Sequence, residues 1–221
     1  MRNILTQTLT VCATACVLTF VTGCKTNDHD STQASAQPAP AMATPPAPTA
    51  PAAMAPATTS AAPALKAGPD GIYRVKAGST DPFTDSAGHV WQGEVGFDGG
   101  DVIERDASTT IANTKDAGLF RSEHYSMNSF SCSVPNGKYI AKLYFAETYD
   151  GITDAGQRVF SYNVEGQHNV KDLDLWVKTG GADRAYVDTF PVDVTNGKFT
   201  ITFTPNVENP EINAIELDPQ H

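Results

Sequence analysis

Tyr149 stands in a polar loop, in the stretch LYFAETYDGITDAGQRVFSYNVEG that covers residues 143–166. The apolar runs on either side predict two strands, so this tyrosine lies in a loop, outside the segments expected to form the core. Its neighbours Asp150 and Gly151 are equally unsuited to a core. An aromatic ring with a polar tip, next to a carboxylate, can contact both the apolar face and the polar edge of a ligand. We therefore interpret Tyr149 as a contact residue for a molecule outside the protein.

Residues suited to catalysis or metal binding do not form a recognisable motif. The sequence has no G-x-S-x-G, H-E-x-x-H or G-x-G-x-x-G pattern and no Cys/His metal spacing. A glycosidase would need two carboxylates about 5–10 Å apart, and the candidates are Glu147, Asp150, Asp154 and Glu208. Calcium would need hard oxygen ligands, and the candidates are Asp81, Asp85, Asp150 and Asp154. Both alternatives stay open, but we expect a protein that is not an enzyme and has no cofactor or metal.

The charge balance excludes one class of partner. The 221 residues contain 15 Lys and Arg against 25 Asp and Glu, which gives a formal net charge of -10. Binding to phosphate backbones needs clustered Lys and Arg, and the sequence has no basic run. We therefore expect no nucleic-acid partner.

Residues 1–23 have the features of an export signal. Arg2 supplies a small positive end, and an apolar stretch that closes with small residues follows. The segment VTGC that ends at Cys24 resembles the lipobox of bacterial lipoproteins, in which the cysteine becomes the lipid-bearing N-terminus. The alternative is an ordinary signal peptide with a chance cysteine. The resemblance implies a lipid-anchored protein at the cell membrane or outer membrane that faces the periplasm or the exterior, and Lys25 after the cysteine favours the outer membrane.

Residues 24–67 are predicted to be a disordered linker. They are rich in Ala, Pro, Thr and Ser and contain almost nothing that could be buried. Of the 4 cysteines, Cys12 and Cys16 belong to the signal and Cys24 to the lipid site. Only Cys132 remains beyond the linker, so we expect no intramolecular disulfide in the folded part.

Residues 68–221 are predicted to form one all-β domain. Short strand-like segments repeat along it, and only residues 170–181, VKDLDLWVKTGG, hint at a helical turn. Apolar and polar residues alternate within the segments, as in residues 198–205, where Phe199, Ile201 and Phe203 are separated by threonines. This pattern is typical of an antiparallel, jelly-roll-like β-sandwich. Two Asn-Gly pairs, at residues 136–137 and 196–197, predict tight hairpins between consecutive strands.

The order of motifs resembles a malectin domain. The matching pieces are TDSAGHVWQGEVGFDGGDV, LFRSEHYSMNSFSCSVPNGKYIAKLYFAETY, GQRVFSYNVEGQ, VKDLDLW and ENPEINAIELD. No single piece is decisive, but the ordered set covers nearly the whole domain. The resemblance implies a jelly-roll-like sandwich that binds carbohydrate, best known for glucose-containing oligosaccharides, and that has no catalytic activity.

The resemblance also implies a set of contact residues. The sugar-contacting loops of the family correspond here to Tyr125, Tyr149 and Asp150, Glu208 and Asn209. Two of these positions depart from the family pattern: Asp150 replaces a second aromatic, and Glu208 replaces an aspartate. Tyrosine rings suit the C–H face of a sugar, and carboxylates and amides suit its hydroxyls. By contrast Glu123, inside a predicted strand, is expected to make structural hydrogen bonds.

The sequence therefore predicts a non-catalytic carbohydrate-binding module that is displayed on a membrane by a lipid anchor. The expected partners are carbohydrate and, through the N-terminal lipid, the membrane. The alternative is a cell-envelope module for adhesion or protein–protein interaction that uses the same fold. A sugar site should be a small groove with exposed aromatic faces, whereas a protein interface should be broader, flatter and apolar.

Overall fold

The computed structural model describes residues 62–221, and the predicted signal peptide, Cys24 and most of the predicted linker lie outside this range. The described part contains fourteen strands and two short helices. The strands are β1 (Tyr73–Lys76), β2 (Phe83–Thr84), β3 (Val90–Trp91), β4 (Phe97–Asp98), β5 (Asp101–Glu104), β6 (Ser122–Tyr125), β7 (Ser129–Ser133), β8 (Gly137–Phe145), β9 (Val159–Val164), β10 (His168–Leu173), β11 (Tyr186–Val194), β12 (Lys198–Val207), β13 (Glu211–Ile212) and β14 (Ala214–Gln220). The helices are α1 (Ala117–Phe120) and α2 (Leu175–Thr179), so the predicted helical turn is present.

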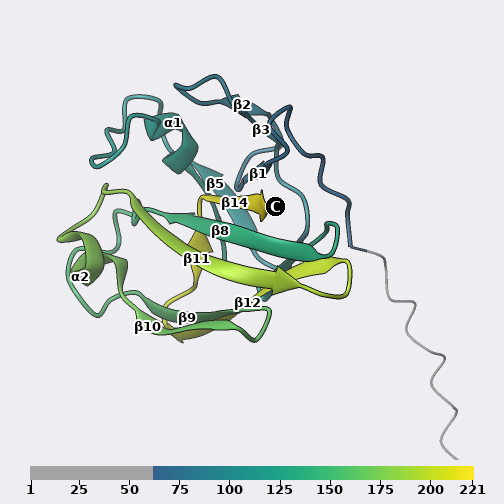
Figure 1. The fold of residues 1–221 in the computed structure, drawn as a ribbon. Helices are drawn as coiled ribbons and strands as arrows, with labels where there is room; N and C mark the ends of the chain where they lie inside the picture. Colours follow the sequence, from purple (N-terminus) through teal and green to yellow (C-terminus); the bar gives the residue numbers. More distant parts are fainter. Residues whose placement is uncertain (1–61) are drawn as a thin grey trace, which may run out of the picture. The chain divides into compact units, whose positions relative to one another are not determined.

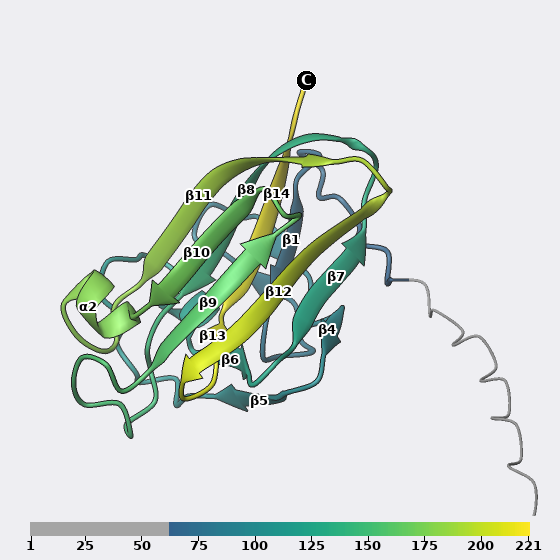
Figure 2. The same ribbon diagram turned by 90° about the horizontal axis from the view of Figure 1, so that it is seen from below.

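Two antiparallel sheets form a sandwich, which confirms the predicted fold class. One sheet has the order β1-β14-β8-β11 and the other has the order β10-β9-β12-β7-β4. Figure 1 shows the edges of the two layers, and Figure 2 shows the second sheet from below. Several strands that follow one another in the sequence lie in different sheets, and this gives the jelly-roll-like connectivity.

The core lies between these sheets, where the alternating apolar residues of both meet. On β8, Ala141, Leu143 and Phe145 are fully buried while Lys142 points outward and bonds Glu216. On β12 the alternation predicted from the sequence is confirmed, because Phe199 and Ile201 are fully buried and Thr202 is exposed. Alternation of this kind buries one face of each strand and leaves the other polar.

The two predicted Asn-Gly hairpins are wrong. Strand β7 pairs with β12 and β4 and not with β8, while β11 pairs with β8 and not with β12. Each Asn-Gly pair therefore carries the chain from one sheet to the other, and Asn136 accepts a hydrogen bond from the Gly197 N–H. The hairpin signal failed because the strands on both sides of each turn are apolar on their inner faces, and those faces pack against each other across the sandwich instead of lying in one sheet. A tight hairpin does join β9 to β10, and its turn residues Glu165 and Gly166 both have positive φ.

A third, smaller sheet with the order β13-β6-β5 adjoins the sandwich. In this sheet β6 is paired with β5 on one edge and with β13 on the other, and residues of β5 and β6 line the pocket described below. The end of the predicted linker also contacts the fold: Ala64 pairs with Ser133, and Leu65 is buried in the core. Within residues 62–221 no helix is long and apolar enough to span a membrane.

Cys132 is the one cysteine of the described range, and it is a buried free thiol. Burial raises its pKa to about 12, with a smaller contribution from the charge of Glu165. The thiol is therefore protonated and unreactive at neutral pH, which fits a packing role.

Candidate functional site

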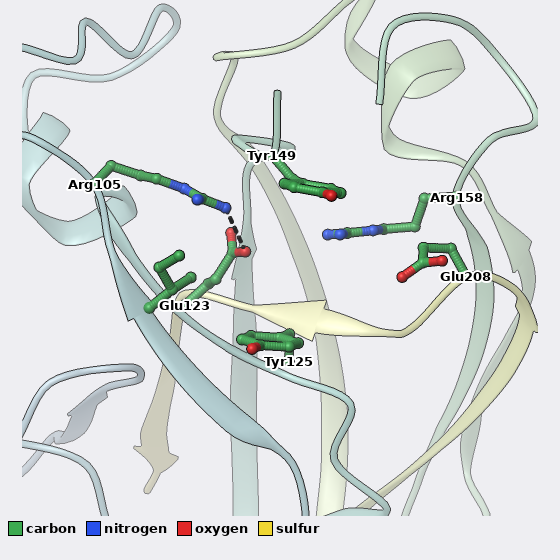
Figure 3. Close-up of a pocket in the computed structure, with 7 residues that line it drawn as sticks. Arg105, Glu123, Tyr125, Tyr149, Arg158 and Glu208 are labelled. Atoms are coloured by element: carbon green, nitrogen blue, oxygen red, sulfur yellow. Dashed lines mark hydrogen bonds and ion pairs between the residues drawn. The ribbon is translucent and has the colours of Figure 1, made fainter. Parts of the chain in front are cut away.

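A pocket of about 220 Å³ lies over the third sheet and is bordered by loops that come from both sheets of the sandwich. It is lined by Ile103, Arg105, Glu123, Tyr125, Tyr149, Arg158 and Glu208. The rings of Tyr125 and Tyr149 lie on opposite sides of the pocket, with Arg105 and Glu123 on one flank and Arg158 and Glu208 on the other (Figure 3). The volume is below the roughly 300–1,000 Å³ of drug-sized sites, so the pocket suits a small ligand or one unit of a longer chain.

Tyr149 belongs to the loop that follows β8, and its side chain is exposed, with 46 % relative accessibility. The loop turns tightly, because the Ile152 N–H donates to the Tyr149 carbonyl over 2.9 Å. The ring lies against Gly151, where an added Cβ would come within 2.5 Å of a ring carbon. The guanidinium groups of Arg105 and Arg158 lie 6.0 and 5.9 Å from the ring centre, a distance at which cations attract the ring. The glycine and the two arginines thus set the orientation of the ring.

Tyr125 ends strand β6, which places its ring on the opposite side of the pocket. The strand is held on both edges, since Tyr125 is paired with Asp101 of β5 and with Glu211 of β13. The next residue, Ser126, has φ of 62° and donates its N–H to the Pro210 carbonyl. This contact ties the end of β6 to the loop that carries Glu208, so the tyrosine and the carboxylate are positioned together.

Arg105 and Glu123 form a closed hydrogen-bond triangle with Thr148 at one flank of the pocket. The Arg105 Nη2 donates to Glu123 Oε1 over 2.9 Å, and its Nε donates to Thr148 Oγ1 over 3.0 Å. The Thr148 hydroxyl in turn donates to Glu123 Oε2 over 2.9 Å. Glu123 makes the structural hydrogen bonds expected from the sequence, and it also lines the pocket, a role that its place inside a strand did not indicate.

Arg158 and Glu147 form the other charged pair. The Arg158 Nε lies 3.4 Å from Glu147 Oε2, and the two side chains are 5 % and 1 % exposed. Glu147 Oε1 accepts the Tyr149 N–H over 3.0 Å, so this pair also supports the tyrosine loop. Burial raises the pKa of Glu147, and Arg158 opposes that rise. The Nε and Nη1 of Arg158 have no hydrogen-bond partner among the described residues.

Glu208 and Asn209 lie in the loop between β12 and β13. Glu208 lines the pocket and is exposed, and its φ of 58° turns the chain sharply after β12. The Asn209 Nδ2 donates to Glu208 Oε1 over 3.1 Å. Asn209 is half-buried and does not line the pocket, so it contacts the pocket only through the carboxylate that it orients.

Asp150 is separate from the other residues predicted from the sequence. It is exposed and does not line the pocket. Burial and then the charge of Asp150 raise the pKa of Asp183, so the charge of Asp150 acts on Asp183 and not on the residues of the pocket lining. The structure thus brings Tyr125, Tyr149 and Glu208 together, adds Asn209 behind Glu208, and leaves Asp150 outside.

Of the carboxylates named for the calcium and glycosidase alternatives, only Glu208 lies in the pocket. The Asp85 carboxylate accepts hydrogen bonds from the His89 N–H and the Trp91 indole, so it organises its own loop. In the range 62–221 no group of three or more His, Cys, Asp or Glu side chains is arranged to hold a metal ion.

Four lining residues were missed from the sequence: Ile103, Arg105, Glu123 and Arg158. Each lies in or beside a short strand, where a single charged or apolar residue resembles the ordinary alternation of a sheet. Their common role arises only when β5, β6 and the loop before β9 meet, and no local pattern encodes that meeting.

Comparison with known proteins gives a consistent result. The family model for the malectin domain matches residues 71–215. Malectin-B of Xenopus laevis is 30 % identical over 123 residues, which cover 48 % of this chain and 44 % of that protein. Malectin of Homo sapiens is 29 % identical over 123 residues, which cover 48 % of this chain and 41 % of that protein. The chain therefore spans less than half of the length of these curated relatives.

Solved structures show the same fold at low identity. A β-glucuronidase of Bacteroides uniformis superposes with a TM-score of 0.61 and 21 % identity over 68 % of this chain and 18 % of that chain. The plant receptor-like kinase FER superposes with a TM-score of 0.60 and 18 % identity over 67 % of this chain and 49 % of that chain. Because the family model covers well over half of the sequence, this chain belongs to the malectin-domain family.

Proposed function

We propose that this domain is a non-catalytic carbohydrate-binding module whose ligand lies between Tyr125 and Tyr149. The observation that carries the proposal is the pair of tyrosine rings on opposite sides of one small pocket (Figure 3). A sugar ring has a face of C–H groups and a rim of hydroxyls, so it needs aromatic surfaces above or below and polar groups around it. The flanks of the pocket supply both kinds of polar partner: the guanidinium groups donate, and the carboxylates accept.

The proposed ligand is a glucose-containing oligosaccharide or polysaccharide, as the family resemblance implies. The charges at the pocket support a neutral sugar, since Arg105 pairs with Glu123 and Arg158 with Glu147, which leaves no cation of the pocket lining unpaired for an anionic ligand, and the remaining carboxylate of Glu208 can accept hydrogen bonds from hydroxyls. Alternating donors and acceptors can bond adjacent hydroxyls without a net charge on the ligand. Because Asp150 replaces the second aromatic residue of the family pattern and does not line the pocket, we expect a shallow site of moderate affinity.

Replacing Tyr149 with alanine should weaken sugar binding about ten-fold, because an aromatic contact is worth roughly 0.5–1.5 kcal/mol beyond the area that it buries. The fold should survive, since the side chain is exposed and surface changes usually stay within about ±0.5 kcal/mol. The measurement is calorimetric titration of the chain with an α-linked glucose disaccharide and longer oligomers, together with thermal melts. Tyr125→Ala is expected to give a similar loss.

The matched control is Tyr149→Phe, which keeps the ring and removes only the hydroxyl. It should retain most of the affinity if the ring face is what the sugar contacts. Unfolding of the alanine variant would instead assign Tyr149 to the core. Normal folding with undiminished sugar binding would place the site elsewhere. If the parent chain binds no sugar on a glycan array, the adhesion or protein–protein interaction module becomes the better account.

We also propose that the domain is held at a membrane, in the cell membrane or outer membrane, by a lipid on Cys24. The support is the VTGC segment after an apolar stretch and before the Ala/Pro-rich linker. Cys24→Ser should therefore move nearly all of the protein from the membrane fraction to the soluble fraction in the native host. Cys132→Ser, a buried thiol elsewhere, is the control and should stay with the membrane. A Cys24→Ser protein that still requires detergent for release would contradict the anchor.

A further inference from the structure

His124 lies in β6 between Glu123 and Tyr125, two residues of the pocket lining, but it does not line the pocket itself. Its side chain is buried, with 5 % relative accessibility. Its Nε2 lies 2.8 Å from the Gly99 carbonyl oxygen, and its Nδ1 lies 3.0 Å from Glu94 Oε1. The second contact has the length of an ion pair, although it lacks the alignment of a hydrogen bond. Both ring nitrogens therefore face oxygen atoms that can only accept.

Two accepting oxygens favour the doubly protonated, cationic ring of His124. A neutral imidazole has an N–H on one nitrogen and a lone pair on the other, so it would direct a lone pair at one of the two oxygens. The ring of Phe97 stacks on the imidazole, with 4.2 Å between the ring centres and 14° between the planes, and an aromatic face attracts a cation. Burial lowers the pKa of His124, but Glu94 and the Gly99 carbonyl raise it by more, so the net change is upward.

The charges that act on His124 come from two parts of the chain. Glu94 precedes β4 and Asp101 begins β5, and both raise the pKa of the ring. The residues paired opposite His124 in the two flanking strands are apolar, namely Val102 in β5 and Ile212 in β13. The positive charge of the ring is therefore stabilised from two sides, and the ring loses its proton only above its ordinary titration range.

The cationic ring holds the turn between β4 and β5. This turn contains Gly99, whose carbonyl faces Nε2, and Gly100, which has φ of 84°. Gly100 packs directly on the ring, since an added Cβ would come within 2.7 Å of His124 Nε2. On the other side of the ring, Glu94 is fixed in turn, because its Oε2 accepts the Gly78 N–H over 2.6 Å. The imidazolium thus joins the turn to a second, separately anchored segment.

Strand β5 depends on this support because it has few other contacts. All four of its residues are exposed, and in the described part of the chain β5 is paired with β6 along one edge and with no strand along the other. It carries Ile103 and leads directly into Arg105, and both residues line the pocket. A shift of the turn at the start of β5 is therefore transmitted to the pocket through a strand of four residues.

We propose that His124 is a positioning residue for the pocket: as an imidazolium it locks the β4–β5 turn and holds the β5 flank in place, and on losing a proton to solvent it releases that flank. This inference rests on the proposed function of the same pocket and specifies how that function is regulated. After deprotonation a lone pair faces either the Glu94 carboxylate or the Gly99 carbonyl, and that contact is lost. Sugar affinity should therefore be highest at low pH and fall as the pH rises through the pKa of His124 in the folded protein. By linkage, bound sugar should raise that pKa.

The test combines two titrations of the full chain. NMR between pH 5 and pH 10 follows the His124 ring, identified by the signal that His124→Gln removes, and the backbone of residues 99–104. The ring should titrate above the ordinary value of about 6.5, and the backbone signals should change in the same window. Calorimetry with an α-linked glucose disaccharide should show affinity falling about five-fold across that window, the equivalent of one ordinary hydrogen bond. Saturating sugar should raise the NMR midpoint by about 0.7 unit, the logarithm of that five-fold change.

Glu94→Gln tests the cause, because it removes the charge beside the ring and keeps an oxygen for the Gly78 N–H. The midpoint of His124 should fall by about 1–3 units, and the loss of sugar affinity should move to lower pH by the same amount. Ionisation of a buried acid elsewhere, such as Glu211, would not produce this coupled shift. Glu104→Gln is the matched control on β5, because the Glu104 side chain is 63 % exposed and its charge is screened by solvent. Both midpoints should stay where they are in the parent.

The outcomes separate this inference from the proposed function. A His124 ring that titrates at or below about pH 6.5 in the parent overturns the inference. An affinity that stays constant while the ring titrates overturns it as well, and both results come from the parent even if Glu94→Gln does not fold. So does a loss of affinity that stays at the same pH when Glu94→Gln moves the midpoint. In each of these cases sugar binding itself stands. Absence of sugar binding at every pH overturns the proposed function, and the inference with it.

Discussion

Replacing Arg158 with methionine is expected to lower the free energy of unfolding by about 3–5 kcal/mol, the range observed when one partner of a buried ion pair is removed. Methionine fills much of the same volume, so the loss comes from charge and not from a cavity. The change leaves Glu147, which is 1 % exposed, without its cation. It also leaves Arg105 as the single guanidinium for Glu123, Glu147 and Glu211. Denaturant unfolding at pH 7 measures the effect.

Two companion variants test the reason for the loss. Adding Glu147→Gln to Arg158→Met removes the orphaned charge and should recover a large part of the lost stability. Lys138→Met breaks an ion pair with Asp193 whose side chains are 75 % and 49 % exposed, and it should cost no more than about 1 kcal/mol. A loss below about 1 kcal/mol for Arg158→Met would mean that Glu147 reaches solvent once its partner is gone. Glu147 would then not belong to a rigid buried cluster.

The fold could be predicted from the sequence because its signals are local. Strands such as β8 and β12 alternate apolar and polar residues along their length, and the sandwich is the structure in which the apolar faces of many such strands are covered. The connectivity could not be predicted in the same way. An Asn-Gly pair specifies a tight turn but not whether the following strand joins the same sheet, and here both pairs lead to the opposite sheet.

The candidate site could be predicted only in part, for a related reason. Tyr149 could be predicted because an aromatic residue in a polar loop does not fit the alternating pattern of the strands on either side. The charged residues of the pocket give no such signal, since Arg105, Glu123 and Arg158 are spread over 54 positions and each resembles the solvent-facing residue of a strand. Glu211 is the extreme example: an acid in a two-residue strand would be assigned to the surface, yet it is fully buried. Only the tertiary structure places these groups in one cluster.

The buried carboxyl group of Glu211 makes the stability of the fold depend on pH, whether or not a ligand is bound. Because the pKa of Glu211 is raised in the folded protein, its contribution to stability is fully present below the pKa of the unfolded chain, about 4.3. That contribution is lost as the pH rises from there through the pKa of the folded state. The unfolded chain ionises in this window while the folded protein stays protonated, so unfolding releases a proton. The parent should therefore lose up to about 1.4 kcal/mol of stability per pH unit from this residue.

Glu211→Gln is expected to remove that slope. Glutamine has the same shape and stays neutral, so the stability of the variant relative to the parent should increase steadily between pH 5 and pH 8, whatever the difference at pH 5. Denaturant unfolding at several pH values measures the change. Glu104→Gln is the control, because the Glu104 side chain is 63 % exposed and the variant should follow the parent throughout. Parallel stability curves for Glu211→Gln and the parent would mean that Glu211 is ionised in the folded protein, so that three buried carboxylates share the two guanidinium groups.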